Sequence, residues 1–167
     1  MKTCSYYEAD FCGLKTRLAL CVQDEKLVEL SFSGIDSDDV MDSGSAVHNA
    51  IITAVWRQIA EYAAGRRQVF DLPVEISGTE FQMKVWNALT QIPYGETVSY
   101  QDIAQAAGNR AACRAAGGAI HRNPVSIIIP CHRVIGANGS LTGFGGGLAV
   151  KEKLLYLERQ TLTGTVR

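Results

Sequence analysis

The sequence predicts a small α/β N-terminal domain, formed by an antiparallel sheet and a helix, followed by a mainly helical C-terminal domain that contains a helix-turn-helix. Three observations support this fold class. Two apolar, partly alternating segments lie near the N-terminus, helical apolar spacing dominates the remainder, and two short helical patterns flank a Gly-containing turn. A chain of 167 residues can form two small domains. We place them at residues 1–75 and 79–167.

The two apolar segments, residues 16–22 and 27–32, flank a polar turn and predict an antiparallel hairpin or meander. An acidic loop is expected over residues 33–45. A helix is predicted over residues 46–64, ending at Gly65, because apolar side chains recur on one face at helical spacing: Ile52, Trp56, Ile59, Ala60 and Ala63. An extended stretch, residues 71–78, then links the two domains.

The C-terminal domain is expected to begin with a helix over residues 79–91. Ser99, with Asp102 three residues later, predicts an N-cap for a helix that ends at Gly108. Asn109 is expected to cap the next helix, residues 110–121, which must end before Pro124. These two short helices form the predicted helix-turn-helix.

The remaining elements surround one cysteine. Residues 126–129 are apolar and predict a short buried strand that leads to Cys131. An irregular turn or hairpin is expected over residues 134–139. Residues 148–160 are predicted to form the final helix.

Charge is distributed unevenly along the chain. Residues 1–78 carry 7 Lys and Arg against 12 Asp and Glu, whereas residues 79–167 carry 9 against 5. A phosphate-rich partner would therefore be attracted to the second half, although such a split also arises by chance in small domains.

The five cysteines are an odd number, and they accompany neither a signal-peptide pattern nor a long apolar run. This predicts a reducing location, cytoplasmic or, in a eukaryote, nuclear, and no membrane span. We expect Cys4 and Cys21 to be free thiols rather than zinc ligands, because the nearest histidine after Cys21 is His48.

The pentapeptide of residues 129–133, Ile-Pro-Cys-His-Arg, is the strongest functional signal. Cys131 is followed directly by His132, and an imidazole is one common means of ionising a thiol near neutral pH. A single Cys-His pair is weak evidence, because many cysteines are simply small buried apolar residues.

The second helix of the predicted helix-turn-helix has an unusual composition. Between Asn109 and Ile120 its side chains are almost all small: Ala111, Ala112, Cys113, Ala115, Ala116, Gly117, Gly118 and Ala119. Glycine costs about 1 kcal/mol per residue in a helix relative to alanine, so something should require it. Close helix packing is one explanation. Entry into the minor groove of DNA, only about 6 Å wide, is the other.

Further segments accompany the pentapeptide in order. They are Val98-Ser99-Tyr100, Arg114-Ala115-Ala116-Gly117-Gly118, Asn123-Pro124, and Gly146-Gly147-Leu148 followed by Lys151-Glu152 and Glu158. With them, residues 79–160 resemble the O6-alkylguanine-DNA alkyltransferase family. The first 75 residues match that family only in general character.

The resemblance implies a direct displacement in which Cys131 attacks the alkyl carbon on guanine O6, with one turnover per molecule. It places His132 and Glu158 in a relay that reaches the sulfur through a turn or a bridging water. Asn123 would orient the turn that presents the cysteine. Tyr100 would contact the guanine and neutralise charge as the base leaves.

The resemblance also implies a base-flipping mode of binding to double-stranded DNA through the minor groove. Arg114 would fill the space left by the extruded base. Other DNA contacts are expected from Tyr100, Gln101, Asn109, Ala112, Ala115, Gly117 and Gly118. Backbone groups near Val134 and Gly145, with Phe144 as a wall, would hold the base. Some relatives have Tyr-Ser where this chain has Phe144-Gly145, and some have Pro at Ser126.

We expect a monomer that needs no metal or organic cofactor. Three other interpretations compete with alkyl transfer. They are a non-catalytic protein that binds alkylguanine in DNA, a helix-turn-helix regulator with a structural Cys-His pair, and a cysteine hydrolase. The first lacks the reactive cysteine in known cases, the small-residue helix disfavours the second, and no oxyanion-hole pattern supports the third.

Overall fold

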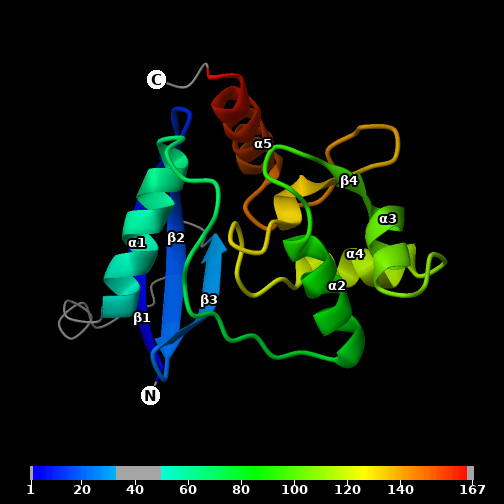
Figure 1. Ribbon diagram of the computed structural model, residues 1–167, viewed down its shortest axis with the longest axis horizontal. Helices are drawn as coiled ribbons and strands as arrows, with labels where there is room; N and C mark the ends of the chain where they lie inside the picture. Colours follow the sequence, from blue (N-terminus) through cyan, green and yellow to red (C-terminus); the bar gives the residue numbers. More distant parts are fainter. Residues whose placement is uncertain (1, 33–49, 165–167) are drawn as a thin grey trace.

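The computed structural model describes residues 2–32 and 50–164. A three-stranded antiparallel sheet forms one side of the molecule, in the order β1 (Thr3–Phe11), β2 (Leu14–Gln23) and β3 (Lys26–Phe32) (Figure 1). The predicted hairpin is β2–β3, and its turn residues Asp24 and Glu25 both have positive φ. Two such residues are typical of the tight turns whose twist matches that of a hairpin.

The sequence did not predict β1. This strand lies at the sheet edge, and only Ala9 and Phe11 in it are buried, so its pattern carries little apolar signal. Its register places Cys4 directly opposite Cys21. A disulfide joins the two residues, so the expectation that both are free thiols was wrong. The pairing depends on this unpredicted strand, so no local pattern indicates it.

Helix α1 (Ala50–Ala63) packs on β1 and β2. The predicted start of this helix and the predicted acidic loop lie outside the described residues. Trp56 is only half-buried and stacks on Tyr7 at 5.0 Å between ring centroids. The buried face is displaced from the predicted one and consists of Ile52, Val55, Gln58, Ile59 and Tyr62.

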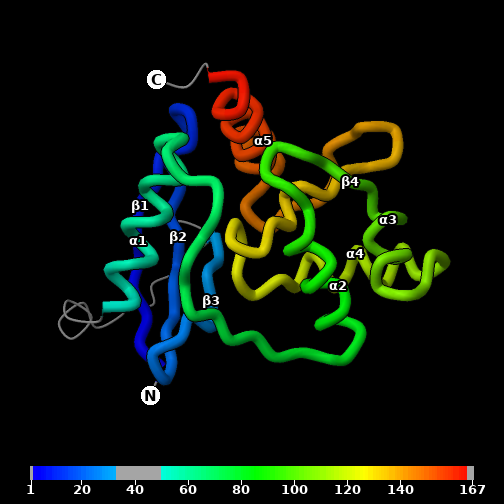
Figure 2. The backbone as a smooth tube through the Cα atoms, viewed as in Figure 1, coloured from blue at the N-terminus to red at the C-terminus, as the bar shows by residue number. Residues whose placement is uncertain are grey.

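The free edge of β3 joins the two halves of the chain. The backbone of Leu27 exchanges hydrogen bonds with Pro73 and Glu75 in the linker, at 2.8 and 2.9 Å. Leu30 donates to the Pro124 carbonyl and accepts from the Ser126 amide, at 2.9 and 2.7 Å. Figure 2 shows the linker running alongside the sheet and then across the lower part of the molecule to α2. The segment that precedes Cys131 is therefore anchored on the N-terminal sheet.

Four helices surround the rest of the C-terminal half: α2 (Glu80–Thr90), α3 (Tyr100–Ala106), α4 (Cys113–His121) and α5 (Leu148–Thr163). Ser99 and Asp102 form the predicted capping box of α3. Helix α4 begins three residues later than predicted. Asn109 does not cap it, because its side-chain oxygen accepts from the Ala111 amide at 3.1 Å within the preceding turn.

Two predicted elements near Cys131 have a different form. Residues 126–129 form a turn with isolated bridges rather than a strand, because Ile127 has a φ of 72° that interrupts the extended backbone. Strand β5 (Val134–Ile135) pairs in parallel with β4 (Val98–Ser99) rather than within a local hairpin. Helix α5 ends at Gly164, beyond the predicted end at residue 160.

One cluster of buried apolar side chains extends through both halves of the described chain. It includes members of the sheet, of α1, of the segment before Cys131 and of α5, among them Phe11, Leu30, Ile59, Ile127 and Leu157. The C-terminal half therefore shares a hydrophobic core with the N-terminal sheet and with α1.

Candidate active site

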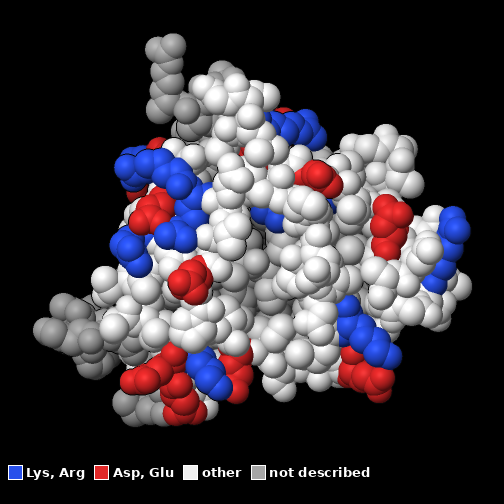
Figure 3. Space-filling view, in the orientation of Figure 1, with Lys and Arg blue, Asp and Glu red and all other residues white. Residues whose placement is uncertain are grey.

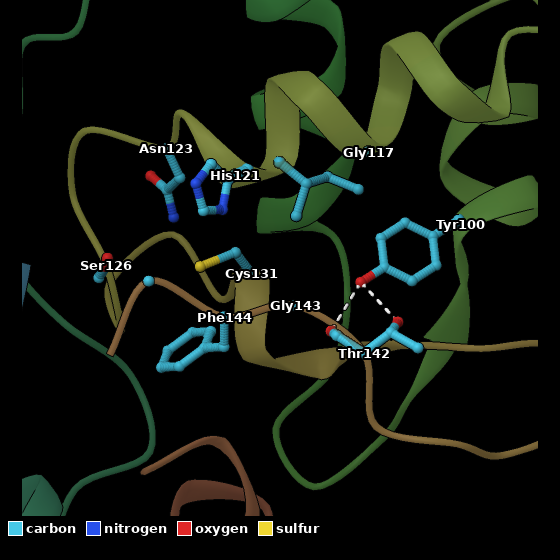
Figure 4. A pocket seen from close by; sticks show the side chains of 11 residues that line it. Tyr100, Gly117, His121, Asn123, Ser126, Cys131, Thr142, Gly143 and Phe144 are labelled. Carbon is cyan, nitrogen blue, oxygen red and sulfur yellow. Dashed lines mark hydrogen bonds between the residues drawn. The ribbon is translucent and has the colours of Figure 1, made fainter. Parts of the chain in front are cut away.

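A cavity of about 260 Å³ opens between α4 and the loop before α5 (Figure 4). Cys131 lies on its wall and is only 7% exposed. Figure 4 shows its sulfur between Asn123 and Phe144, with Tyr100 across the opening. The lining residues are Tyr100, Gly117, Ile120, His121, Asn123, Ser126, Cys131, Thr142, Gly143, Phe144 and Gly145.

Asn123 shapes the turn that presents Cys131. Its side-chain amide donates to the Ile129 carbonyl at 2.7 Å, and its side-chain oxygen accepts from the Val125 amide at 3.0 Å. The chain then enters a single turn of 3₁₀ helix, Cys131–Arg133. Because such a helix has three residues per turn, Cys131 and His132 point in different directions. The sulfur faces the cavity, while the imidazole lies wholly within the core.

Glu158 is the shared hydrogen-bonding partner of four residues near Cys131. Its Oε1 lies 2.7 Å from His132 Nε2 and accepts from Arg133 Nη2 at 2.9 Å and from the Tyr62 hydroxyl at 2.8 Å. Its Oε2 accepts from Arg133 Nε at 2.9 Å and from the Gly95 amide at 3.0 Å. Glu158, His132 and Tyr62 are all fully buried. Every lone-pair direction of this carboxylate is therefore occupied.

The protonation states follow from these contacts. Burial alone would raise the pKa of Glu158, but the hydrogen bonds from His132 and Arg133, together with the Arg133 charge, outweigh it and lower the pKa to about 2. Burial lowers the pKa of His132 more than Glu158 raises it. The imidazole is therefore neutral, and its Nε2 carries the proton that faces the carboxylate. His132 Nδ1 is buried, has no hydrogen-bond partner in the described part of the chain, and is left as the basic atom.

Cys131 rests as a thiol. Burial raises its pKa, and the smaller opposing effects of Asn123 and Lys151 do not reverse the shift. The sulfur must therefore lose its proton during the reaction rather than before it. His132 Nδ1 is the nearest base in sequence, but no hydrogen bond joins the two side chains within the described residues. The predicted turn or bridging water between them stays a prediction.

Lys151 anchors the loop that carries Thr142, one of the residues that line the cavity. Its ammonium group is buried and donates to the carbonyls of Val134 and Thr142, at 2.6 and 3.0 Å. The Tyr100 hydroxyl donates to the same Thr142 carbonyl at 3.1 Å and accepts from the Thr142 hydroxyl at 3.1 Å. Burial lowers the pKa of Lys151. Through these hydrogen bonds, Lys151 connects the loop before α5 to β5, and the shared Thr142 carbonyl connects that loop to Tyr100.

The structure brings some of the predicted site residues together and separates others. Cys131, Asn123, Tyr100, Gly117, Phe144 and Gly145 line one cavity. Val134 does not line it, because its side chain is buried elsewhere and its carbonyl oxygen accepts from Lys151. The predicted DNA contacts outside the cavity lie on α3, on α4 and in the turn between them. Of these, Gln101, Asn109, Arg114 and Ala115 are exposed, and Ala112 and Gly118 are half-buried.

Packing accounts for only part of the small-residue pattern of α4. Ala116 and Ala119 are buried, and the Trp86 indole of α2 donates to the Ala119 carbonyl at 2.9 Å. By contrast, a β-carbon added at Gly118 would meet no atom within 4 Å, and Ala115 is exposed. Contact within the chain therefore does not require small side chains at Gly118 and Ala115.

Charge near this face is modest and of both signs, since α3 also exposes Asp102. Figure 3 shows Lys and Arg side chains at the right-hand end of the molecule, where Figure 1 places the turn between α3 and α4. Arg110 and Arg114 are the exposed cations of this region. Arg110 contacts Gln101 at 3.4 Å, whereas Arg114 projects from the first turn of α4.

Sequence reasoning missed several groups that complete the site. Tyr62 and Gly95 reach Glu158 from distant parts of the chain, and no local pattern indicates such contacts. Arg133 and Lys151 belong to the sequence motifs, which by themselves assign them no role. Lys151 offers one usable signal, since it lies at helical spacing with the buried Leu154 and Leu155.

Within residues 2–32 and 50–164, no group of three or more His, Cys, Asp or Glu side chains is arranged to hold a metal ion. No helix in these ranges combines the length and apolar character that crossing a bilayer requires.

Fold and site together define a class of protein in which a buried cysteine lies on the wall of a cavity, beside a helix of mostly small side chains. Known proteins are similar to this chain in sequence and in structure. Residues 80–160 match the family model described as 6-O-methylguanine DNA methyltransferase, DNA binding domain. A methylated-DNA–protein-cysteine methyltransferase of Methanosarcina acetivorans is 46% identical over 82% of this chain and 81% of that protein. The inducible enzyme of the same name from Bacillus subtilis is 56% identical over 62% of this chain and 58% of its own length.

Solved structures extend the similarity to nearly the whole chain. The O6-methylguanine methyltransferase of Mycobacterium tuberculosis has a TM-score of 0.80 and 37% identity, covering 96% of this chain and 94% of that one. A structure of Mycobacterium tuberculosis OGT in complex with DNA has a TM-score of 0.77 and 39% identity over 93% of each chain. The chain belongs to the methylated-DNA–protein-cysteine methyltransferase family.

Proposed function

We propose that this protein repairs DNA directly, by moving the methyl or other alkyl group of O6-alkylguanine to the sulfur of its own Cys131. The observation that carries the proposal is the position of Cys131 on the wall of a cavity with the His132–Glu158 pair directly behind it. The family membership and the relatives' names supply the reaction class. O4-alkylthymine is a further candidate substrate.

The chemistry is a single displacement. The Cys131 sulfur forms a bond to the alkyl carbon as the bond from that carbon to guanine O6 breaks, and the bonding electrons pass to the oxygen and the ring. The thiol proton passes to the basic Nδ1 of His132, and the departing guanine takes one proton from the Tyr100 hydroxyl, which is re-protonated from solvent. Glu158 fixes the imidazole tautomer, as the acid does in a catalytic triad. Tyr100 lies at the cavity wall, and its hydroxyl can turn from the Thr142 carbonyl to donate to the departing base.

The geometry also favours entry of an extruded base. The outer face of α4 offers small side chains and Arg114, which suits contact with the minor groove and replacement of the flipped nucleotide. Phe144 and Gly145 would bound the base, with backbone groups of that loop at its edge. Because Val134 lies outside the cavity lining, its carbonyl is a weaker candidate for such a contact.

The thioether product has no polarised carbonyl for water to attack, so each molecule acts once. We infer that residues 79–167 bind DNA and transfer the group while residues 1–75 support them. We also infer that the protein acts as a monomer, without a cofactor, in the cytoplasm or, in a eukaryote, the nucleus.

The test is to incubate the protein with a duplex containing O6-methylguanine and to measure its intact mass. We expect the gain of one methyl group per chain, located on Cys131 by peptide mapping. The matched variant Cys131→Ser should bind the same duplex without any gain in mass. Binding without transfer by the unaltered protein would favour a non-catalytic alkylguanine-binding protein instead, and indifference to the lesion would favour a regulator or a hydrolase.

A further inference from the structure

Tyr62 connects the N-terminal half of the molecule to the reactive centre. It lies on α1, 96 residues before Glu158, and its hydroxyl donates to Glu158 Oε1 at 2.8 Å. The same oxygen atom of Tyr62 lies 3.5 Å from His132 Nε2. All three side chains are fully buried.

The direction of this hydrogen bond follows from the charges. Glu158 is ionised, so its oxygens can only accept, and His132 Nε2 already gives its proton to Oε1. Burial and the nearby Glu158 charge raise the pKa of Tyr62 well above its ordinary value. The phenol therefore keeps its proton at neutral pH and acts as a donor.

We propose that Tyr62 is a positioning residue for the alkyl transfer. By sharing Oε1 with His132, its hydroxyl fixes the carboxylate and limits how strongly that carboxylate favours a protonated imidazole. His132 is thereby kept neutral, with Nδ1 available as the base for the Cys131 thiol. This inference rests on the proposed function, and it gives the N-terminal half a direct part in the site.

Among the described residues, Tyr62 is a neutral side-chain donor to Glu158 whose hydroxyl can be removed without altering His132 itself. Arg133 pairs with both oxygens of Glu158, so the two charges largely offset each other. Lys151 adds positive charge from the same helix as Glu158 and lowers the His132 pKa slightly further. The charged or titratable groups facing the imidazole are thus Glu158 and Lys151 from α5, Arg133 and Cys131 from its own turn, and Tyr62 from α1.

The experiment uses Tyr62→Phe in the full chain. The ring contacts with Phe11, Phe70 and Tyr94 are retained in this variant, so the core stays filled. Without the hydroxyl, Oε1 bears more negative charge toward His132, and the His132 pKa should rise. Because only the neutral imidazole can accept the thiol proton, the acid limb of the pH–rate profile should move to higher pH.

The readout is the single-turnover rate of methyl transfer from a duplex containing O6-methylguanine, measured across pH. We expect Tyr62→Phe to be about tenfold slower near pH 6 and to approach the unaltered protein above about pH 8. Nitrogen NMR of the His132 ring should report the same upward shift of its titration. Tyr94→Phe is the matched control, because it removes a second tyrosine hydroxyl of this cluster that is not a partner of Glu158 in the described structure.

The outcomes separate the two proposals. If the unaltered protein transfers methyl but Tyr62→Phe has the same profile, or is slowed equally at every pH, the positioning role is refuted while the proposed function stands. If the unaltered protein transfers no methyl group, both proposals are refuted. A shift of equal size in Tyr94→Phe would assign the effect to the cluster as a whole and refute a specific role for Tyr62.

Discussion

Glu158 shows at the scale of one residue how this site is held. The side chain has no exposure to solvent, and its charge is stabilised by a two-pronged contact with Arg133, a backbone amide and two neutral donors. Removing one partner of a buried ion pair leaves an uncompensated charge, which costs far more than a surface pair contributes. Glu158 therefore matters to stability as well as to the orientation of His132.

We predict that Glu158→Gln lowers the free energy of unfolding by about 3–5 kcal/mol, because Arg133 loses its counter-charge in the core. Urea denaturation at neutral pH measures this loss. Glu152→Gln, a change at an exposed carboxylate of the same helix, should alter stability by less than about 0.5 kcal/mol. Equal stability of the two variants would contradict the assigned role of the buried pair.

The same residue predicts a dependence of stability on pH. The pKa of Glu158 is lowered from 4.5 to about 2 in the folded chain, so its contribution is fully present above pH 4.5 and is lost as pH falls toward 2. That shift corresponds to about 3 kcal/mol. Urea denaturation at pH 4.5 and at pH 2 should show that the unaltered protein loses free energy of unfolding as pH falls. The loss in Glu158→Gln should be smaller by about 3 kcal/mol. Parallel curves for the two proteins would contradict it.

At the scale of elements, α4 is the helix whose composition is not fully explained by packing within the chain. Its inner residues Ala116 and Ala119 are explained by packing on α2, but Gly118 faces open space. The sequence alone left helix packing and minor-groove entry equally open. The structure shows that helix packing does not require glycine at position 118. The minor-groove role of α4 stays a proposal.

We predict opposite effects on stability and binding at Gly118. Gly118→Ala should raise the free energy of unfolding by about 0.5–1 kcal/mol, since no clash opposes the better helix propensity. Gly118→Leu should still fold but should bind duplex DNA several-fold more weakly, because the helix becomes too broad for the groove. Urea denaturation and fluorescence anisotropy measure the two quantities.

The control for that experiment is Ala64→Leu, a change of similar kind at an exposed position beyond α1. It should leave duplex affinity unchanged. Unaltered DNA binding by Gly118→Leu would show that this face of α4 does not meet the duplex.

At the scale of the whole molecule, the N-terminal half stabilises the reactive half from one side. The edge of β3 binds both the linker and the segment before Cys131, and one apolar cluster runs through both halves. The Cys4–Cys21 disulfide lies between β1 and β2, and neither cysteine lines the cavity. The disulfide should therefore contribute to stability without entering the chemistry.

We predict that reducing this disulfide lowers the free energy of unfolding by up to about 3 kcal/mol, since it closes a loop of 17 residues in the unfolded chain. Urea denaturation with and without reductant, together with a count of free thiols, measures the change. The double variant Cys4→Ser and Cys21→Ser should behave like the reduced protein. At temperatures well below unfolding, the rate of methyl transfer should be the same in all three forms. A slower rate on reduction would mean that the sheet communicates with Cys131.

The sequence by itself determined the fold class, because apolar periodicity is a local property of the chain, and it indicated Cys131 and His132 because the two are adjacent. Glu158 was indicated only by the family resemblance, and the structure places it in contact with His132. The sequence also indicated the capping box of α3, which depends on two residues three positions apart. It could not indicate β1, the disulfide or the contact of Tyr62 with Glu158. Each of these depends on which distant segments the collapse of the apolar core brings together, and that was decided only by the tertiary structure.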